Sequence, residues 1–375
     1  NKSMKNLVVI ILFLTLLAFS IFNNVLAQPS SDSLDSKVEA YLKPYVQNKD
    51  FSGSVLLAKG GRVLFSKGYG MSDHKLRVAN NPKTRYRIAS LTKTFTAAAI
   101  LMLNEDRKLN FSDTLSKYVP DYPNGDKITI EHLLLHQSGV PNPDYEKLPN
   151  RTLRIQELVE ALKQKQLDFE PGTNSRYSNG GYVLLAFIIE RASGKPWGDF
   201  LRQKIFKPLG MDDTGVVRNE QNIKNGAFGY VPGAGESRVA NAPFQNLSGS
   251  VGSGSLYSTV EDLYAWARAV KTDKLFKLSS LSYPYGWGKR RYFGREAIEQ
   301  SGLTSGFTSV MQIYPKEDLY VLALSNVEST GFNKWGKDLA AVVLGEEYEP
   351  AKVRKIVHVS PQVLKTFVGN YKDEQ

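Results

Sequence analysis

Two residues with the chemistry of an activated nucleophile lie three positions apart within residues 87–103. Ser90 supplies a hydroxyl and Lys93 an amine, and residues three apart on a helix share one face. Every residue from 97 to 103 is apolar, as in a helix that is buried on all sides. The pair therefore indicates a nucleophile and its base, with a helix cap and a surface charge as the alternative. Spacing alone does not decide, because a second Ser-x-x-Lys begins at Ser72.

A lysine acts as a base near neutral pH only when its surroundings lower its pKa. The start of a buried helix offers Lys93 two such influences, an apolar wall and the positive end of the helix macrodipole. The same helix start points free backbone N–H groups at the space above Ser90, as an oxyanion hole requires. The segment thus has the parts of an amine-assisted serine nucleophile.

Tyr177 is the best candidate for a second proton carrier. It follows a Pro-Gly turn at 171–172, precedes Asn179 at an expected helix start, and lies among small polar residues. Its alternative role is that of a packed tyrosine whose hydroxyl reaches solvent. Tyr122 repeats the Tyr-x-Asn spacing, but in a polar, Pro-rich loop.

Other hydrolytic chemistries find less support in the sequence. The G-x-S-x-G pattern of α/β hydrolases is absent, and the histidines are His74, His132, His136 and His358. His132 and His136 have the i, i+4 spacing of a metal pair, but residues 133–135 are all Leu, so the zinc-protease pattern fails. A structural hydrogen-bonding role is favoured for His136. No metal and no cofactor is predicted.

The charge balance bears on the partners of the protein. Lys and Arg number 48 against 37 Asp and Glu, for a formal net charge of +11. The basic residues are scattered, without a long run interleaved with aromatic residues, so binding of nucleic acid is not predicted. Attraction to an anionic cell envelope or to an acidic substrate fits the excess of positive charge better.

The first residues indicate a secretory signal peptide over residues 1–27. Lys2 and Lys5 precede an apolar-rich run over residues 7–22, and a small residue, Ala27, stands before Gln28. We expect an exported protein, periplasmic or extracellular, that meets a membrane only through this segment if it stays uncleaved. The chain has no cysteine, so neither a lipid-modified cysteine nor a disulfide is expected.

The pattern along the chain predicts an α+β fold. Hairpins are expected at residues 54–67 around Gly60-Gly61 and at residues 307–326 around residues 315–318. Between them the sequence is mainly helical, and a capping box at Ser258–Glu261 would start one of the helices. We therefore expect one antiparallel sheet built from both chain ends and flanked by helices, with a large, mainly helical insertion. The other expected elements are helices over residues 33–46, 130–136, 153–167, 182–192 and 335–344, and a strand over 297–301.

Three groups of residues in this order resemble those of the serine β-lactamase and penicillin-binding superfamily. They are Ser90-Leu-Thr-Lys93, Tyr177-Ser-Asn179, and a Gly-containing strand that precedes Gly306-Phe307. The chain is most similar to the class C β-lactamase-like serine hydrolases, which include esterases and D-amino-acid peptidases. The resemblance covers residues 34 to 345, with further matches at residues 51–53, 68–70, 133–139, 208–211 and 254–258.

The resemblance implies a role for each of these residues. Ser90 would be acylated, with Lys93 and Tyr177 sharing the proton transfers, and water would then cleave the acyl-enzyme. Asn179 would hold both the substrate amide and the lysine. The oxyanion hole would come from the backbone N–H groups of Ser90 and Leu303.

The third motif departs from the family pattern. The family usually has Lys-Thr-Gly, or His-x-Gly in the esterase-like branch, whereas this chain has Gln300-Ser301-Gly302. Gln offers hydrogen bonds but no charge to a substrate carboxylate, and charge-assisted hydrogen bonds are about twice as strong as neutral ones. This weakens the case for efficient β-lactam hydrolysis or D-Ala-D-Ala carboxypeptidase activity. Arg290 or Arg291 would compensate if either lay nearby.

The resemblance also suggests domain limits and a function. Residues 28–350 would form the hydrolase domain, and residues 351–375 a linker and the first strand, over residues 363–371, of a truncated C-terminal β domain. We expect an exported serine hydrolase that cleaves an ester or amide in a small molecule or peptide, with peptidoglycan-derived D-amino-acid peptides among the candidates. The alternatives are a low-efficiency β-lactamase or carboxypeptidase, and a non-catalytic envelope-binding relative.

Overall fold

A computed structural model describes residues 33–218, 223–233, 239–277, 285–329, 331–354 and 360–369. The predicted signal peptide, residues 1–27, and His358 lie outside this part of the chain. Within it, no helix combines the length and the apolar character needed to cross a membrane.

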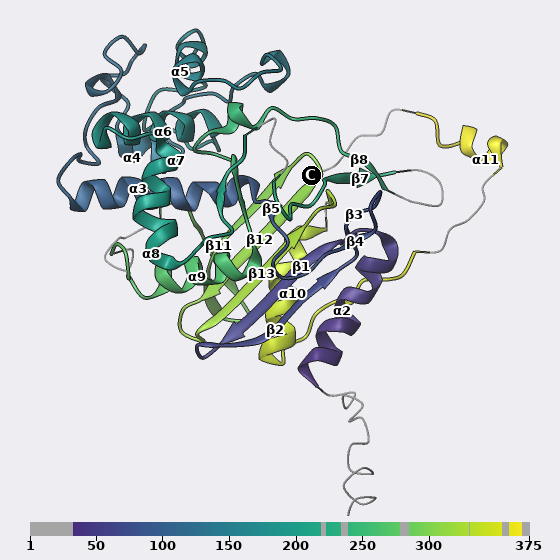
Figure 1. Cartoon of the computed structure of the whole chain (residues 1–375). Helices are drawn as coiled ribbons and strands as arrows, with labels where there is room; N and C mark the ends of the chain where they lie inside the picture. The colour runs from purple at the N-terminus through teal and green to yellow at the C-terminus, as the bar shows by residue number, and fades with distance from the viewer. Residues whose placement is uncertain are drawn as a thin grey trace, which may run out of the picture.

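A six-stranded antiparallel sheet joins the two ends of the described chain, as the sequence predicted. Its strand order is β10-β11-β12-β13-β1-β2, so the N-terminal hairpin pairs with the C-terminal strands through β1 and β13 (Figure 1). The bounds are β1 Gly53–Lys59, β2 Arg62–Tyr69, β10 Gly288–Tyr292, β11 Arg295–Thr304, β12 Phe307–Tyr314 and β13 Leu319–Ser325.

Helices cover both faces of this sheet and enclose a separate core on each side. On one face, α2 (Leu34–Asn48) and α10 (Phe332–Leu344) pack over β2, β12 and β13. On the other face, α9 (Val260–Lys271) packs against β1, β12 and β13, and the larger core continues from there into the helical region. The α+β prediction is confirmed.

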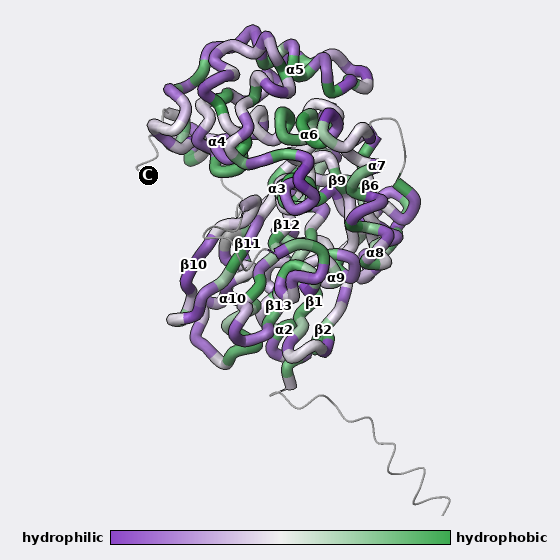
Figure 2. Tube along the Cα trace, turned by 90° about the vertical axis from the view of Figure 1, so that its left-hand side faces the viewer, coloured by the Kyte–Doolittle hydropathy of each residue, from purple (hydrophilic) through white to green (hydrophobic). Residues whose placement is uncertain are grey.

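The helical region lies between β2 and β10 in the sequence and at one end of the sheet in space (Figure 2). Its helices are α3 Thr92–Glu105, α4 Ile130–Leu134, α5 Ile155–Lys163, α6 Asn179–Ser193, α7 Trp197–Leu201 and α8 Lys207–Leu209. Short strands connect this region to the sheet: β3 Met71–Asp73, β4 Val78–Ala79, β5 Tyr86–Arg87, β6 Gly215–Val216, β7 Tyr230–Pro232, β8 Val239–Asn241 and β9 Leu256–Ser258.

Helix α3 is buried almost all round, which explains its unbroken apolar sequence. It packs against α6 and α7, and Phe95 stacks on Trp266 of α9 with ring centroids 4.4 Å apart. Its threonines are satisfied inside the core, because Trp266 donates its indole N–H to Thr94 and Trp197 donates its own to Thr96. The helix is therefore a rigid support for the residues at its start.

Two local predictions are wrong. Helix α9 is capped by Thr259, whose hydroxyl accepts the N–H of Asp262, so the N-cap lies one residue after the Ser258 of the predicted capping box. Ser258 is instead the last residue of β9. The strand expected from residue 363 onwards does not form there, because α11 (Pro361–Lys365) occupies the start of that segment. Pro361 takes the first helical position and Ser360 accepts a backbone N–H, as at a capped helix start.

Candidate active site

Ser90 lies in a short 3-10 helix, η1 (Ala89–Leu91), which leads directly into α3. The residue before it, Ala89, has a φ of +46°, a conformation that costs energy for a residue with a side chain. Such strain is kept only where the surroundings impose it, and here η1 is held between α3 and strand β11. The backbone of Ser90 is thus fixed in a tight bend at the start of a buried helix.

Lys93 is completely buried, one helical turn from Ser90. Its Nζ lies 3.2 Å from Ser90 Oγ, 2.7 Å from Asn179 Oδ1 and 2.9 Å from the backbone oxygen of Ser253. Burial holds the pKa of Lys93 well below its ordinary value. No carboxylate is among these partners, so nothing restores the charge that burial disfavours.

The neutral form of Lys93 can serve as a hydrogen-bond acceptor for Ser90. A neutral amine has two N–H groups and one lone pair. Asn179 Oδ1 and the Ser253 carbonyl are oxygens that can only accept, so they take both N–H groups. The lone pair is left for the third neighbour, and the Ser90 hydroxyl can donate to it.

Tyr177 is the second side chain that contacts Ser90 Oγ. Its hydroxyl donates to Ser90 Oγ at 2.7 Å, and Lys93 Nζ lies 4.6 Å from the centre of its ring. Burial raises the pKa of Tyr177 to about 12, although the residue as a whole is 47% exposed. The hydroxyl therefore keeps its proton at neutral pH and acts as a donor.

The start of helix α6 fixes Tyr177 and Asn179. Ser178 caps the helix, since its hydroxyl accepts the N–H of Gly181, and its own N–H donates to Nδ1 of His136 at 3.1 Å. Burial lowers the pKa of His136 to about 4, so the imidazole stays neutral and accepts. The structural role predicted for His136 is confirmed: it holds the backbone beside Tyr177.

The open edge of strand β11 lies against the nucleophile. Strand β10 pairs with β11 only as far as Glu299, so from Gln300 onwards this edge is not covered by β10. A Cβ added to Gly302 would lie 2.8 Å from the backbone N of Ser90 and 2.6 Å from the carbonyl oxygen of Ile88. The third motif therefore needs glycine at this position, because β11 approaches η1 so closely.

The side chains of Gln300 and Ser301 make no hydrogen bond with Ser90 in the described structure. The Gln300 amide donates to the backbone oxygen of Gly286 at 3.1 Å, and its own oxygen accepts the N–H of Ser301. Ser301 is paired with Val310, which belongs to the core under α10, so its side chain points to the opposite face of the sheet. Substrate binding by Gln300 and Ser301 stays a prediction.

Neither of the arginines proposed as substitutes for the missing cation lies at the site. Arg290 pairs with Ala297 in the strand register and forms an ion pair with Glu299 on the α10 face. Arg291 pairs with Glu296, six residues before Gly302, which is about 20 Å along the strand. Leu303, the proposed second oxyanion donor, follows Gly302 and is 48% exposed.

The competing motifs lie elsewhere. Ser72 is buried in β3, where its hydroxyl donates to the backbone oxygen of Val78. The hydroxyl of Tyr122 is buried without a hydrogen-bond partner in the described structure. His132 closes the capping box of α4 with Thr129. No group of three or more His, Asp or Glu side chains forms a metal site within the described ranges.

Three contributors to the site carried no clear signal in the sequence. Ser253 acts through its backbone oxygen, in a Gly-rich turn where a Cβ at Gly252 would lie 2.4 Å from the Tyr182 carbonyl oxygen. Asn142 accepts the N–H of Asn179. The hydroxyl of Tyr145 is buried beside the side chains of Asn179, Ser250 and Ser253, and it contributes to the raised pKa of Tyr177.

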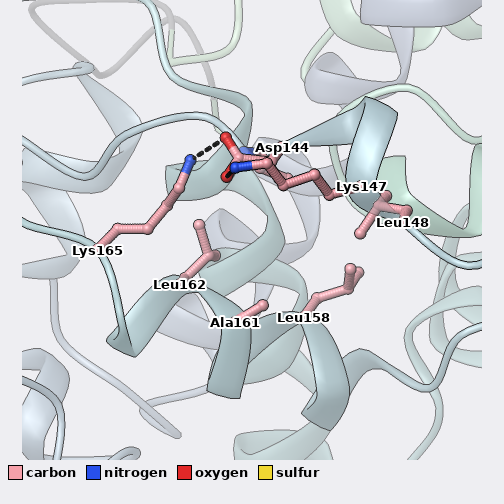
Figure 3. A pocket seen from close by; sticks show the side chains of 8 residues that line it. Asp144, Lys147, Leu148, Leu158, Ala161, Leu162 and Lys165 are labelled. Carbon is pink, nitrogen blue, oxygen red and sulfur yellow. Dashed lines mark hydrogen bonds and ion pairs between the residues drawn. The ribbon is translucent and has the colours of Figure 1, made fainter.

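A cavity of about 160 Å³ lies behind the loop that carries Asn142 and Tyr145 (Figure 3). Leu148, Leu158 and Leu162 contribute apolar side chains to its lining, and Lys165 binds Asp144 across its rim at 2.6 Å. None of the side chains around Ser90 lines it. The cavity therefore underlies the loop and is separate from the candidate active site.

Comparisons with known proteins agree with this geometry. Residues 34–343 match the family described as Beta-lactamase. The chain is 30% identical over 303 residues to a protein of Bacillus subtilis (strain 168) named penicillin-binding protein PbpX, covering 79% of this chain and 74% of that one. It is 31% identical over 300 residues to protein flp of Staphylococcus aureus (strain MRSA252), covering 74% of this chain but only 59% of flp.

A solved structure is also similar over most of the chain. The D-amino acid amidase of Ochrobactrum anthropi SV3, in complex with D-phenylalanine, superposes with a TM-score of 0.72 at 25% identity. The match covers 83% of this chain and 96% of the amidase.

Proposed function

The chain belongs to the Beta-lactamase family and is a serine hydrolase, and we propose that it acts through an acyl-enzyme on Ser90. The observation that carries this proposal is the environment of Lys93. The residue is fully buried, and two oxygens that can only accept surround its amine. This supports Lys93 as the base that takes the proton of Ser90.

In the first step, Ser90 Oγ attacks the carbonyl carbon of an ester or amide while its proton passes to Lys93 Nζ. The carbonyl oxygen becomes an oxyanion, which we assign to the N–H groups of Ser90 and Leu303. The close approach of Gly302 to the Ser90 backbone supports this assignment, because it brings the two segments together.

In the second step, the leaving group departs and takes a proton, leaving the acyl group on Ser90. Tyr177 is suited to deliver this proton, because its hydroxyl is protonated at neutral pH and already donates to Ser90 Oγ. Lys93 then returns the proton to Tyr177 through a water molecule. A water molecule attacks the acyl-enzyme by the same route, which releases the acid and restores the free serine.

The third motif has Gln300 where the family usually has lysine or histidine. It therefore favours substrates whose binding does not require a cation at this position. The Gln300 amide is held by Gly286 and by the backbone of Ser301, so it offers the substrate no cation. We therefore propose simple esters and amides, D-amino-acid amides or peptides among them, as better substrates than β-lactams. The relative that acts on D-amino acid amides supports this choice.

We further propose that the protein works outside the cytoplasm, on peptidoglycan-derived material. The support is the run of charged, apolar and small residues over residues 1–27 and the net charge of +11. An anionic cell envelope would attract such a protein.

A substrate panel tests the proposed activity. The protein from Gln28 onwards is assayed on p-nitrophenyl butyrate, D-phenylalanine amide and a chromogenic cephalosporin, beside its Ser90→Ala variant. We expect hydrolysis of the ester or the amide to exceed that of the cephalosporin and to vanish in the variant. Equal turnover by both proteins would refute the role of Ser90, and preferred turnover of the cephalosporin would refute the substrate class.

A further inference from the structure

Arg87 is a partly buried cation without a polar partner, and it lies three residues before the nucleophile. It ends the short strand β5. In the described structure its guanidinium makes no hydrogen bond and no ion pair, and the contact it makes is with the ring of Phe307, 5.4 Å from the centroid. All five of its N–H donors are therefore free.

A partly buried Arg87 guanidinium without a polar partner destabilises the folded protein unless a ligand binds there. Burial lowers the pKa of Arg87, and no neighbouring carboxylate acts in the opposite direction. A partly desolvated charge without a partner destabilises a fold. Arg85, two residues earlier, shows the usual solution, because it forms an ion pair with Asp213. The fold supplies a carboxylate to one arginine of this segment and leaves the other without one.

The position of Arg87 relates this free cation to the substrate site. Phe307, on which it stacks, is paired with Thr304 at the end of β11. Gly302, two residues earlier on the same strand, lies against the backbone N of Ser90. Along the chain, the Cα atoms of Arg87 and Ser90 are at most about 10 Å apart. The guanidinium thus lies over the first residue of β12, beside the turn that follows Gly302 and Leu303 on β11.

We propose that Arg87 binds a carboxylate carried by the substrate, and so supplies the positive charge that the third motif lacks. The inference rests on the proposed hydrolase activity at Ser90. A carboxylate would take two parallel N–H groups of the guanidinium, a geometry that arginine favours over lysine. Phe307 would hold the plane of the guanidinium in place by cation–π contact.

The test compares esters that differ only in charge. One pair carries the charge on the acyl group, p-nitrophenyl glutarate against the p-nitrophenyl ester of monomethyl glutarate. The other pair carries it on the leaving group, 4-acetoxybenzoate against its methyl ester. In at least one pair, Arg87→Gln should lower kcat/KM for the anionic ester by about tenfold or more. For the neutral ester, kcat/KM of Arg87→Gln should stay within about twofold of the wild-type value.

Arg291→Gln is the matched control, because it removes the same charge from an exposed position on β10, remote from Ser90. Arg291→Gln should leave kcat/KM unchanged for both esters of each pair. Arg87→Gln should also keep or raise the melting temperature, since it removes a charge without a partner. If Arg87→Gln lowered the melting temperature and lowered kcat/KM equally for the anionic and the neutral ester, Arg87 would have a structural role and the proposal would be overturned.

A binding measurement separates this proposal from the hydrolase proposal. The Ser90→Ala protein and the Ser90→Ala/Arg87→Gln protein are titrated by calorimetry with the anionic esters, which needs no turnover. We expect about tenfold weaker binding in the double variant for one of the two esters. Equal affinity, or no detectable binding to either protein, would overturn the role of Arg87 whatever the activity of the wild-type protein.

Discussion

The hydroxyl of Tyr177 donates to Ser90 Oγ at 2.7 Å, although the two residues are 87 positions apart in the sequence. Lys93 also contacts Ser90, and both N–H groups of its neutral amine are taken by Asn179 and Ser253. Ser90 thus lies between a donor and an acceptor. This asymmetry supports the proposal that Lys93 is the base and Tyr177 the acid.

Removing the tyrosine hydroxyl should separate these two roles. Tyr177→Phe should lower kcat by about 10² to 10⁴, the usual contribution of a general acid. Tyr122→Phe is the control, since it removes a buried hydroxyl that has no hydrogen-bond partner in the described structure and takes no part in the candidate site. It should keep the activity within about fivefold and leave the free energy of unfolding unchanged or higher. Comparable losses of kcat in both variants would contradict the assignment.

The rate should fall on the acid side as Lys93 gains a proton. The buried lysine has a lowered pKa, so it is neutral above that pKa and becomes an ammonium group as the pH falls through it. The pH profile of kcat/KM should then have an acid limb whose midpoint lies well below 10.5. Tyr177, with a pKa of about 12, should cause no alkaline loss below about pH 11. A rate that rises until about pH 10.5 would show a solvated lysine.

Gly302→Ala should damage the site without altering a polar side chain. Its Cβ would meet the backbone N of Ser90 at 2.8 Å and Ser309 Oγ at 2.6 Å, so β11 or η1 must shift. Loss of one oxyanion donor costs about 10² to 10³ in kcat. Gly288→Ala is the matched control on β10, where the nearest atom lies at 3.6 Å. Gly288→Ala should retain the full kcat. Equal kcat values in the two variants would show that the oxyanion hole is not formed where Gly302 meets Ser90.

His136 should make the protein sensitive to mild acid. Its pKa of about 4 in the folded state is below the ordinary 6.5, so between these values the unfolded chain binds more protons. The free energy of unfolding should therefore fall as the pH is lowered from about 6.5 to 4, by up to about 3 kcal/mol from this group. Urea unfolding of the wild-type and His136→Asn proteins at pH 7 and 4.5 measures the difference. A drop of the same size in both proteins would exclude His136 as its source.

Elements with a strong local pattern could be predicted from the sequence. The hairpin around Gly60-Gly61 and the buried helix α3 follow from turn chemistry and from an unbroken apolar run. Ser90 and Lys93 were found together because they lie one turn apart. The prediction of Tyr177 and Asn179 depends on the order of motifs along the chain, since no local pattern shows which distant residues contact a buried lysine.

What escaped prediction depends on tertiary contacts. Ser301 lies on the α10 face of the sheet because it pairs with Val310. The Gln300 amide binds the backbone oxygen of Gly286 because Gly286 lies beside α3. The lack of a polar partner for Arg87 among the described residues shows only in the three-dimensional structure. The Ser-Pro pair at 360–361 is typical of a helix start, whereas the apolar run after it favours a strand, and the structure has the short helix.

Covalent labelling of Ser90 tests the central claim most directly. The protein from Gln28 onwards and its Ser90→Ala variant are incubated with a fluorophosphonate probe, and intact mass and peptide mapping follow. We predict one adduct per chain on the peptide that contains Ser90, and none in the variant. A wild-type protein that stays unlabelled while it hydrolyses an ester, or one labelled at another residue, would contradict the account.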